Sequence, residues 1–171
     1  MDSLTAFLLF CQGLGAFVGA VSAVWAEISY IRAMRSGHLD RAERAHLKVL
    51  GHGLRYGMTL LLLSSLGLVI TAYLKHAMVQ PALTSDYWIS ITFAVLIIAL
   101  SWALSRNRIS FALGSVAAST AWWALMILAY RHAPGISYGD ALAAYVIATA
   151  ILYALFFYIR FILAHPRSAI L

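Results

Sequence analysis

The chain has 171 residues, of which 63% are hydrophobic and only 11% are charged, and its formal net charge is +6. Soluble domains carry roughly a quarter charged residues, so this composition excludes an ordinary water-soluble fold. One cysteine, Cys11, excludes an intrachain disulfide and a multi-cysteine metal site.

Five apolar segments predict an all-α integral membrane protein that forms a single helical-bundle domain over residues 1–171. Each segment reaches or approaches the ~20 residues that a helix needs to cross a bilayer. The predicted spans are residues 5–31, 56–74, 87–105, 109–130 and 141–159. The first apolar run has no Lys or Arg before it, which is unlike a secretory signal, so we expect it to remain as a span.

The distribution of basic residues predicts that the N-terminus lies outside and the C-terminus inside. The two odd-numbered connections and the C-terminal tail hold Arg32, Arg35, Arg41, Arg44, Lys48, Arg55, Arg106, Arg108, Arg160 and Arg167, whereas the opposite face holds Lys75 and Arg131. Cytoplasmic segments are enriched in Lys and Arg, so topology explains the basic charge without nucleic-acid binding. We expect the bacterial cytoplasmic (inner) membrane as the location.

The long first connection predicts a short amphipathic helix over about residues 40–50, lying along the inner membrane surface. Asp40 and Glu43 have the spacing of a capping box. Gly51 and Gly53 would then let the chain turn up into the second span, or let another backbone or a ligand come close. The residues expected to contact lipid headgroups, anionic ones included, are Arg32, Arg35, Arg41, Arg44 and Lys48.

Small residues recur at helical spacing on the first two spans, and such stripes allow membrane helices to approach closely. On the first span they are Gly15, Gly19 and Ser22, and beside them Ala16, Ala20, Ala23 and then Glu27. On the second they include Gly53, Gly57 and Ser64. The stripes predict that these spans pack together, with the first span central, although one stripe alone would equally suit a homodimer face.

Glu27 is an acidic residue attached to an apolar span, and ionisable groups at the membrane edge suggest function. Its depth matches that of Arg55, and His52 lies one turn further toward the inner side. Glu27 and His52 could form a protonatable gate, because imidazole titrates near neutral pH, or the three could form an anion or metal site. The structural alternative is a Glu27–Arg55 ion pair that pins two helices, and the sequence favours it.

Histidines near the helix ends raise the possibility of haem b or another metal, because membrane cytochromes use histidine pairs on neighbouring helices. His76 pairs formally with His132 at the outer ends, and His52 with His165 at the inner ends. His52 and His76 are separated by roughly 36 Å along a helix, more than the ~30 Å hydrocarbon core. The spacing therefore favours histidines in loops over haem ligands.

No sequence motif of a hydrolase, metalloprotease or nucleotide-binding enzyme is present, so enzyme activity is not the favoured interpretation. The favoured function is a transporter or channel for a small solute, ion or proton, acting as an oligomer with an inner gate at Glu27, His52 and Arg55. The alternatives are a membrane redox subunit and an accessory anchor of a larger complex. The expected partners are membrane lipids and either further copies of the chain or other membrane subunits.

Overall fold

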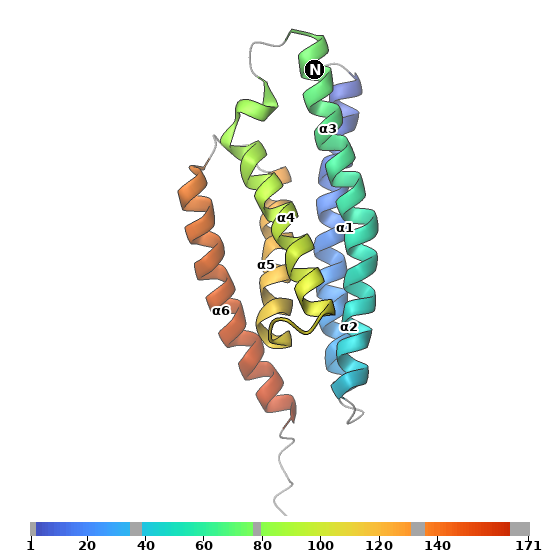
Figure 1. Cartoon of the computed structure of the whole chain (residues 1–171), viewed down its shortest axis with the longest axis vertical. Helices are drawn as coiled ribbons and strands as arrows, with labels where there is room; N and C mark the ends of the chain where they lie inside the picture. The colour runs from blue at the N-terminus through green and yellow to red at the C-terminus, as the bar shows by residue number, and fades with distance from the viewer. Residues whose placement is uncertain (1–2, 35–38, 77–79, 131–135, 165–171) are drawn as a thin grey trace, which may run out of the picture.

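A computed structural model of the chain describes residues 3–34, 39–76, 80–130 and 136–164. The described residues are almost entirely helical, and no strand occurs among them. Five helices in these ranges are long and apolar enough to cross a membrane, which confirms the predicted all-α class and the predicted number of candidate spans. They run side by side along the long axis of the molecule (Figure 1), with the N-terminus at the upper end.

The elements are α1 (Ser3–Met34), α2 (Leu39–Gly53), η1 (Leu54–Met58), α3 (Thr59–Leu74), η2 (Pro81–Leu83), α4 (Ser85–Ser105), α5 (Phe111–Tyr130) and α6 (Tyr138–Ala164). The expected spans match α1, α4 and α5 to within a few residues. The last span, α6, is longer than expected at both ends. The second expected span, residues 56–74, is the upper part of a helix that begins at Leu39.

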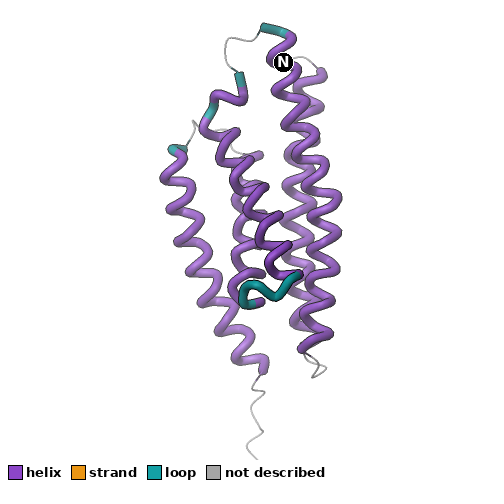
Figure 2. The backbone as a smooth tube through the Cα atoms, in the orientation of Figure 1, coloured by secondary structure: helices purple, strands orange, loops and turns teal. Residues whose placement is uncertain are grey.

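Elements α2, η1 and α3 form one uninterrupted helical rod, so the expected turn at Gly51 and Gly53 is absent (Figure 2). Gly53 has helical dihedral angles, with φ −57° and ψ −43°. A Cβ atom at Gly53 would collide with the side chain of Ser22 on α1. This glycine therefore serves the close approach of two helices and not a bend of the chain.

The backbones of α1 and the rod touch at η1, a single π-helical turn. A Cβ atom on Gly15 would lie 2.8 Å from the carbonyl oxygen of Gly57 and 2.7 Å from the backbone nitrogen of Leu61. A Cβ atom on Gly57 would lie 2.8 Å from the carbonyl oxygen of Gly15. The predicted packing of the first two spans through their small residues is confirmed, and π turns of this kind often occur at functional sites.

Helices α1 and α5 form the centre of the bundle. Helix α1 contacts α2, η1, α3 and α5, which confirms its predicted central place, and its second stripe is buried, from Ala16 at 0% exposure to Glu27 at 8%. Helix α5 is buried without interruption over residues 114–122. The indole ring of Trp122, fully buried, fills the notch that Gly19 leaves in α1.

Helix α6 stands at the edge of the bundle, where it contacts α5 and α4 (Figure 1). Its most apolar stretch contains no buried residue, and large side chains such as Val146 and Ile151 are more than 60% exposed. An apolar groove of about 480 Å³ separates part of α6 from α4 and α5. Apolar packing therefore holds α6 more weakly than the other spans, so polar contacts contribute a larger share of its attachment to the bundle.

Candidate functional site

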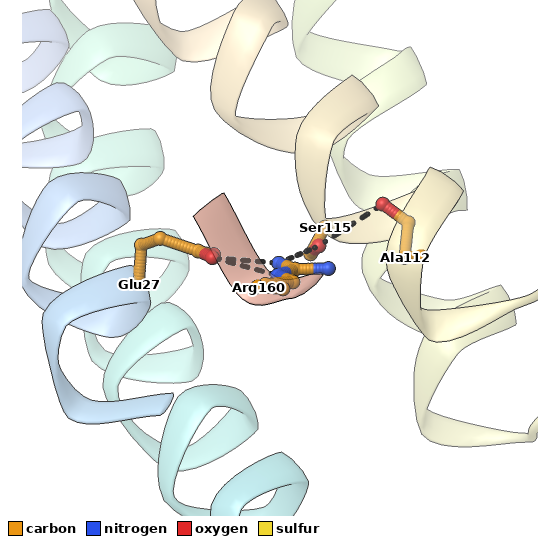
Figure 3. Close-up of polar contacts among 4 residues, drawn as sticks. All are labelled: Glu27, Ala112, Ser115 and Arg160. Atoms are coloured by element: carbon orange, nitrogen blue, oxygen red, sulfur yellow. Dashed lines mark hydrogen bonds and ion pairs between the residues drawn. The ribbon is translucent and has the colours of Figure 1, made fainter. Parts of the chain in front are cut away.

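A buried ion pair between α1 and α6 lies in the lower part of the bundle (Figure 3). The Arg160 Nη2 and Nε groups both donate to Glu27 Oε1, over 2.7 and 3.1 Å. The side chains are only 12% and 11% exposed for Arg160 and Glu27. Such a pair joins the central helix to the peripheral one through two charges that have lost most of their water.

Helix α5 adds a third side to this site. Arg160 Nη2 also donates to Ser115 Oγ over 3.1 Å, and Ser115 Oγ donates to the backbone oxygen of Ala112 over 3.3 Å. One guanidinium group therefore connects α1, α5 and α6. Hydrogen bonds beyond the ion pair itself are what a buried charge needs to offset its desolvation.

Aromatic rings surround the guanidinium group and replace further solvent. The Arg160 Cζ atom lies 4.7 Å from the ring centre of Tyr30, 5.7 Å from that of Phe111 and 5.9 Å from that of Phe156. The rings of Tyr30 and Phe111 also stack on each other, with centroids 4.8 Å apart. A cation near ring faces within ~6 Å is attracted by their quadrupoles, so the site is built for a positive charge.

The structure corrects the expected partner of Glu27. Instead of Arg55 and His52, whose side chains are exposed on the rod, Arg160 binds the carboxylate. His52 Nδ1 lies 2.7 Å from the backbone oxygen of Lys48, and its ring stacks on Tyr56. The reason is that α6 continues to Ala164, so Arg160 lies within a helix and not in a tail.

The other candidate ligands are separated or lie outside the described residues. His52 lies within the rod and His76 lies two residues beyond its upper end, and both are exposed, while His132 and His165 belong to residues that the structure does not describe. Within the described ranges, no group of three or more His, Cys, Asp or Glu side chains is placed to hold a metal ion. The haem and metal hypotheses therefore remain sequence predictions.

The basic residues expected at lipid headgroups are exposed wherever their side chains are described. Arg32, Arg44 and Lys48 are all on the surface, and the Arg32 Cζ atom lies 5.7 Å from the ring centre of Trp25. Arg35 and the side chain of Arg41 lie outside the described part of the chain. Arg32 lies in the last turn of α1, and Arg44 and Lys48 lie on α2.

A second feature is a cleft of about 380 Å³ at the upper end of the bundle, which we call the upper cleft. Seven of the fourteen residues that line it are polar, and these are Thr5, Gln12, Ser65, Thr84, Asp86, Tyr87 and Ser90. The other seven are apolar and alternate with polar residues along α1 and α3; they are Leu9, Leu61, Leu68, Pro81, Leu125, Leu128 and Ala129. The lining residues come from α1, α3, η2, α4 and α5 and from the η2–α4 connection, so the cleft opens between helices that are far apart in sequence.

One hydrogen bond crosses between helices in this lining. Gln12 Nε2 on α1 donates to Ser65 Oγ on α3 over 3.0 Å. Other hydroxyl groups along α1 and α3, including Ser22, Ser64 and Thr71, donate to the backbone of their own helix. Gln12 and Ser65 therefore form the polar link between the two helices beside the cleft.

Trp122 and Gly19 lie between the upper cleft and the ion pair along both central helices. On α5, Trp122 precedes the cleft residues Leu125 and Leu128 and follows Ser115. On α1, Gly19 lies roughly 11–12 Å from Gln12 and from Glu27 at ~1.5 Å per residue. The order from top to bottom is therefore an open polar cleft, a filled constriction and a buried ion pair.

The upper cleft has room for a small molecule, and the ion pair links α1 to α6 at the other end of the bundle. No protein-family model, no curated protein and no solved structure matches the chain.

Proposed function

We propose that the protein is a membrane transporter or channel for a small solute or ion. The observation that carries this proposal is the order of the three features along α1 and α5: the upper cleft, the Trp122 constriction and the Glu27–Arg160 pair. In this scheme the cleft receives the solute, and the ion pair is the closed gate. Opening requires α6 to separate from α1 at that pair, and the sparse burial of α6 favours such movement.

We propose that the N-terminus lies outside and the C-terminus inside a cytoplasmic membrane of a bacterium. Among the described cations, Arg32, Arg44, Lys48, Arg106 and Arg108 belong to the lower end of α1, to α2 and to the α4–α5 connection, whereas Lys75 follows α3 at the upper end. Positive-inside placement would make the lower end cytoplasmic. The upper cleft would then face outward and the gate inward.

The straight rod changes how α2 would meet the membrane. Elements α2, η1 and α3 have 15, 5 and 16 residues, which corresponds to about 54 Å, far more than the ~30 Å hydrocarbon core. We propose that the basic half of α2 extends the rod through the inner headgroup layer, where Arg44 and Lys48 contact anionic lipids. Helix α2 would cross this layer and not lie flat in it.

Function as an oligomer, or with partner subunits, belongs to the same proposal. Large residues such as Trp122 and Phe93 fill the interior of one bundle, so a wide continuous path does not fit within a single copy. Movement of α6, or assembly around it, would have to provide the remaining space.

The proposal is tested with the full chain in proteoliposomes. Vesicle volume recovery after a hyperosmotic step, followed by light scattering, would report the entry of urea, glycerol and salts, and a pH-sensitive dye would report protons. We expect at least one solute to enter faster than in protein-free vesicles. We also expect the double variant Glu27→Gln/Arg160→Gln to change that rate by about tenfold, as expected when a gating equilibrium shifts by ~1.4 kcal/mol.

Arg55→Gln is the matched control, because it removes one positive charge from an exposed site of the rod. It should leave the rate unchanged. The transport proposal fails if no solute or proton enters faster than in protein-free vesicles. The gate proposal fails if a measurable flux is the same in the double variant and the wild type.

A further inference from the structure

We propose that the ligand of the upper cleft is an organic ammonium ion, meaning a protonated amine with an apolar body. The inference rests on the proposed function only in taking the cleft as the place where solute binds. It is drawn from the charge, the hydroxyl acceptors and the apolar residues of the cleft.

The charge of the lining is negative. Asp86, in the first turn of α4, is the charged residue among the fourteen that line the cleft. A carboxylate stabilises a cation and repels an anion. The cleft is therefore suited to a positively charged ligand.

Two hydroxyl groups of the lining already donate their hydrogens to backbone oxygen atoms. Ser90 Oγ donates to the backbone oxygen of Asp86 over 2.8 Å, and Thr84 Oγ1 donates to that of Pro81 over 2.7 Å. A hydroxyl group has one hydrogen, so these two side chains can offer only their oxygen atoms to a ligand. Together with the Asp86 carboxylate they suit a ligand that donates N–H groups.

The apolar residues and the size of the cleft distinguish an organic ammonium from a bare metal ion. Leu9, Leu61 and Leu125 line the cleft together with the polar residues, and apolar side chains offer nothing to a hydrated inorganic cation. A volume of about 380 Å³ is at the small end of the range for organic ligands. Tyr87 also lines the cleft, and aromatic side chains can attract ammonium groups.

The test is a binding measurement on the purified full chain in detergent, with n-butylammonium chloride as the probe. Isothermal titration and the thermal unfolding midpoint should both show saturable binding, because a ligand specific to the folded state raises that midpoint. Butan-1-ol has a similar apolar body without charge, sodium butyrate has the opposite charge, and sodium chloride supplies an inorganic cation. We expect none of these three to reproduce the effect of butylammonium.

Asp86→Asn and Asp86→Ser should each weaken butylammonium binding by about tenfold or more, since a hydrogen bond to a charged group is lost. The serine of Asp86→Ser keeps an uncharged hydroxyl acceptor at the start of α4. This variant therefore removes the charge while keeping a group that stabilises the start of a helix. Asp140→Asn is the matched control, because Asp140 also lies in the first turn of a helix, α6, but outside the cleft. The affinity of the Asp140→Asn variant for butylammonium should remain within about twofold of the wild-type affinity, well under the tenfold loss expected for the Asp86 variants.

Three results would overturn the inference: equal affinity in the Asp86 variants, equal binding of butan-1-ol, or an equal midpoint shift with sodium chloride. Failure here is distinguishable from failure of the transport proposal, because flux of another solute through the vesicles would survive it. Binding of butylammonium without any flux would support the site and count against transport.

Discussion

The ring of Trp122 occupies the space into which any side chain at Gly19 would project. This relationship joins the two central helices at mid-height and closes the bundle below the upper cleft. Trp122 is completely buried, whereas its neighbour Trp123 is 41% exposed on the outer side of α5. The two tryptophans offer a comparison in which chemistry is constant and burial differs.

Trp122→Ala should destabilise the protein by about 3–5 kcal/mol, because it leaves a large cavity between α1 and α5. Trp123→Ala removes the same atoms from a partly exposed position and should cost clearly less. Unfolding of the purified variants by denaturant in mixed detergent micelles, followed by circular dichroism, checks this order. Equal losses for the two variants would mean that Trp122 does not fill the contact with Gly19.

Gly57→Ala should be strongly destabilising, because the new methyl group would stand 2.8 Å from the backbone oxygen of Gly15. Backbone atoms cannot move aside as a flexible side chain can. The matched substitution is Gly51→Ala on the same rod, where a Cβ atom meets nothing within 4 Å. Alanine at position 51 should stabilise the helix by up to about 1 kcal/mol. Thermal unfolding midpoints of the two variants check this, and the described packing would be wrong if Gly51→Ala lowered the midpoint and Gly57→Ala did not.

Glu27→Gln or Arg160→Gln alone should cost about 3–5 kcal/mol, because each leaves a buried charge without its partner. The apolar double variant Glu27→Leu/Arg160→Met should be more stable than either single variant, since no uncompensated charge remains. A double-mutant cycle of unfolding free energies measures this coupling. Additive losses would show that the two side chains do not depend on each other.

Single cysteines introduced into a Cys11→Ala background test the orientation. Leu83 on η2 is 83% exposed at the upper end, and Asn107 is exposed in the α4–α5 connection at the lower end. A membrane-impermeant maleimide applied to intact cells should label Leu83→Cys and spare Asn107→Cys until the membrane is permeabilised. The reverse pattern would place the N-terminus inside and turn the upper cleft toward the cytoplasm.

The number of spans and the contact between the first two were predictable because each depends on local sequence. Continuous apolar stretches identify the helices, and the spacing of Gly15 and Gly19 identifies a face that can approach Gly57. The same reasoning placed Glu27 on a buried face, because it continues the stripe that begins at Ala16.

The partner of Glu27 was not predictable in the same way, because it depends on which helices become neighbours in space. Arg55 was the expected partner because it follows Glu27 in sequence and lies at a similar depth. Arg160 was counted among the basic residues of the tail, since the last span was expected to end at Ile159. The available signal was the apolar run on both sides of it, "FFYIRFILA", which is typical of a helix continuing through an arginine.

The upper cleft as a whole was not predicted from the sequence. Thr5, Gln12 and Asp86 come from separate elements, and individually they are ordinary polar residues near helix ends. Only their arrangement around one space makes them a site, and no spacing within a single segment encodes that arrangement.

The separation of Glu27 and Arg160 by 133 residues sets the order in which the protein can mature. A ribosome adds about 5–20 residues per second, so Glu27 is made several seconds before its partner exists. During that interval the first helix carries an acidic group that has to remain near water or bind a proton. The contact of α1 with Arg160 can therefore form only after α6 has been synthesised, so this part of the bundle closes later than the contact between α1 and the rod.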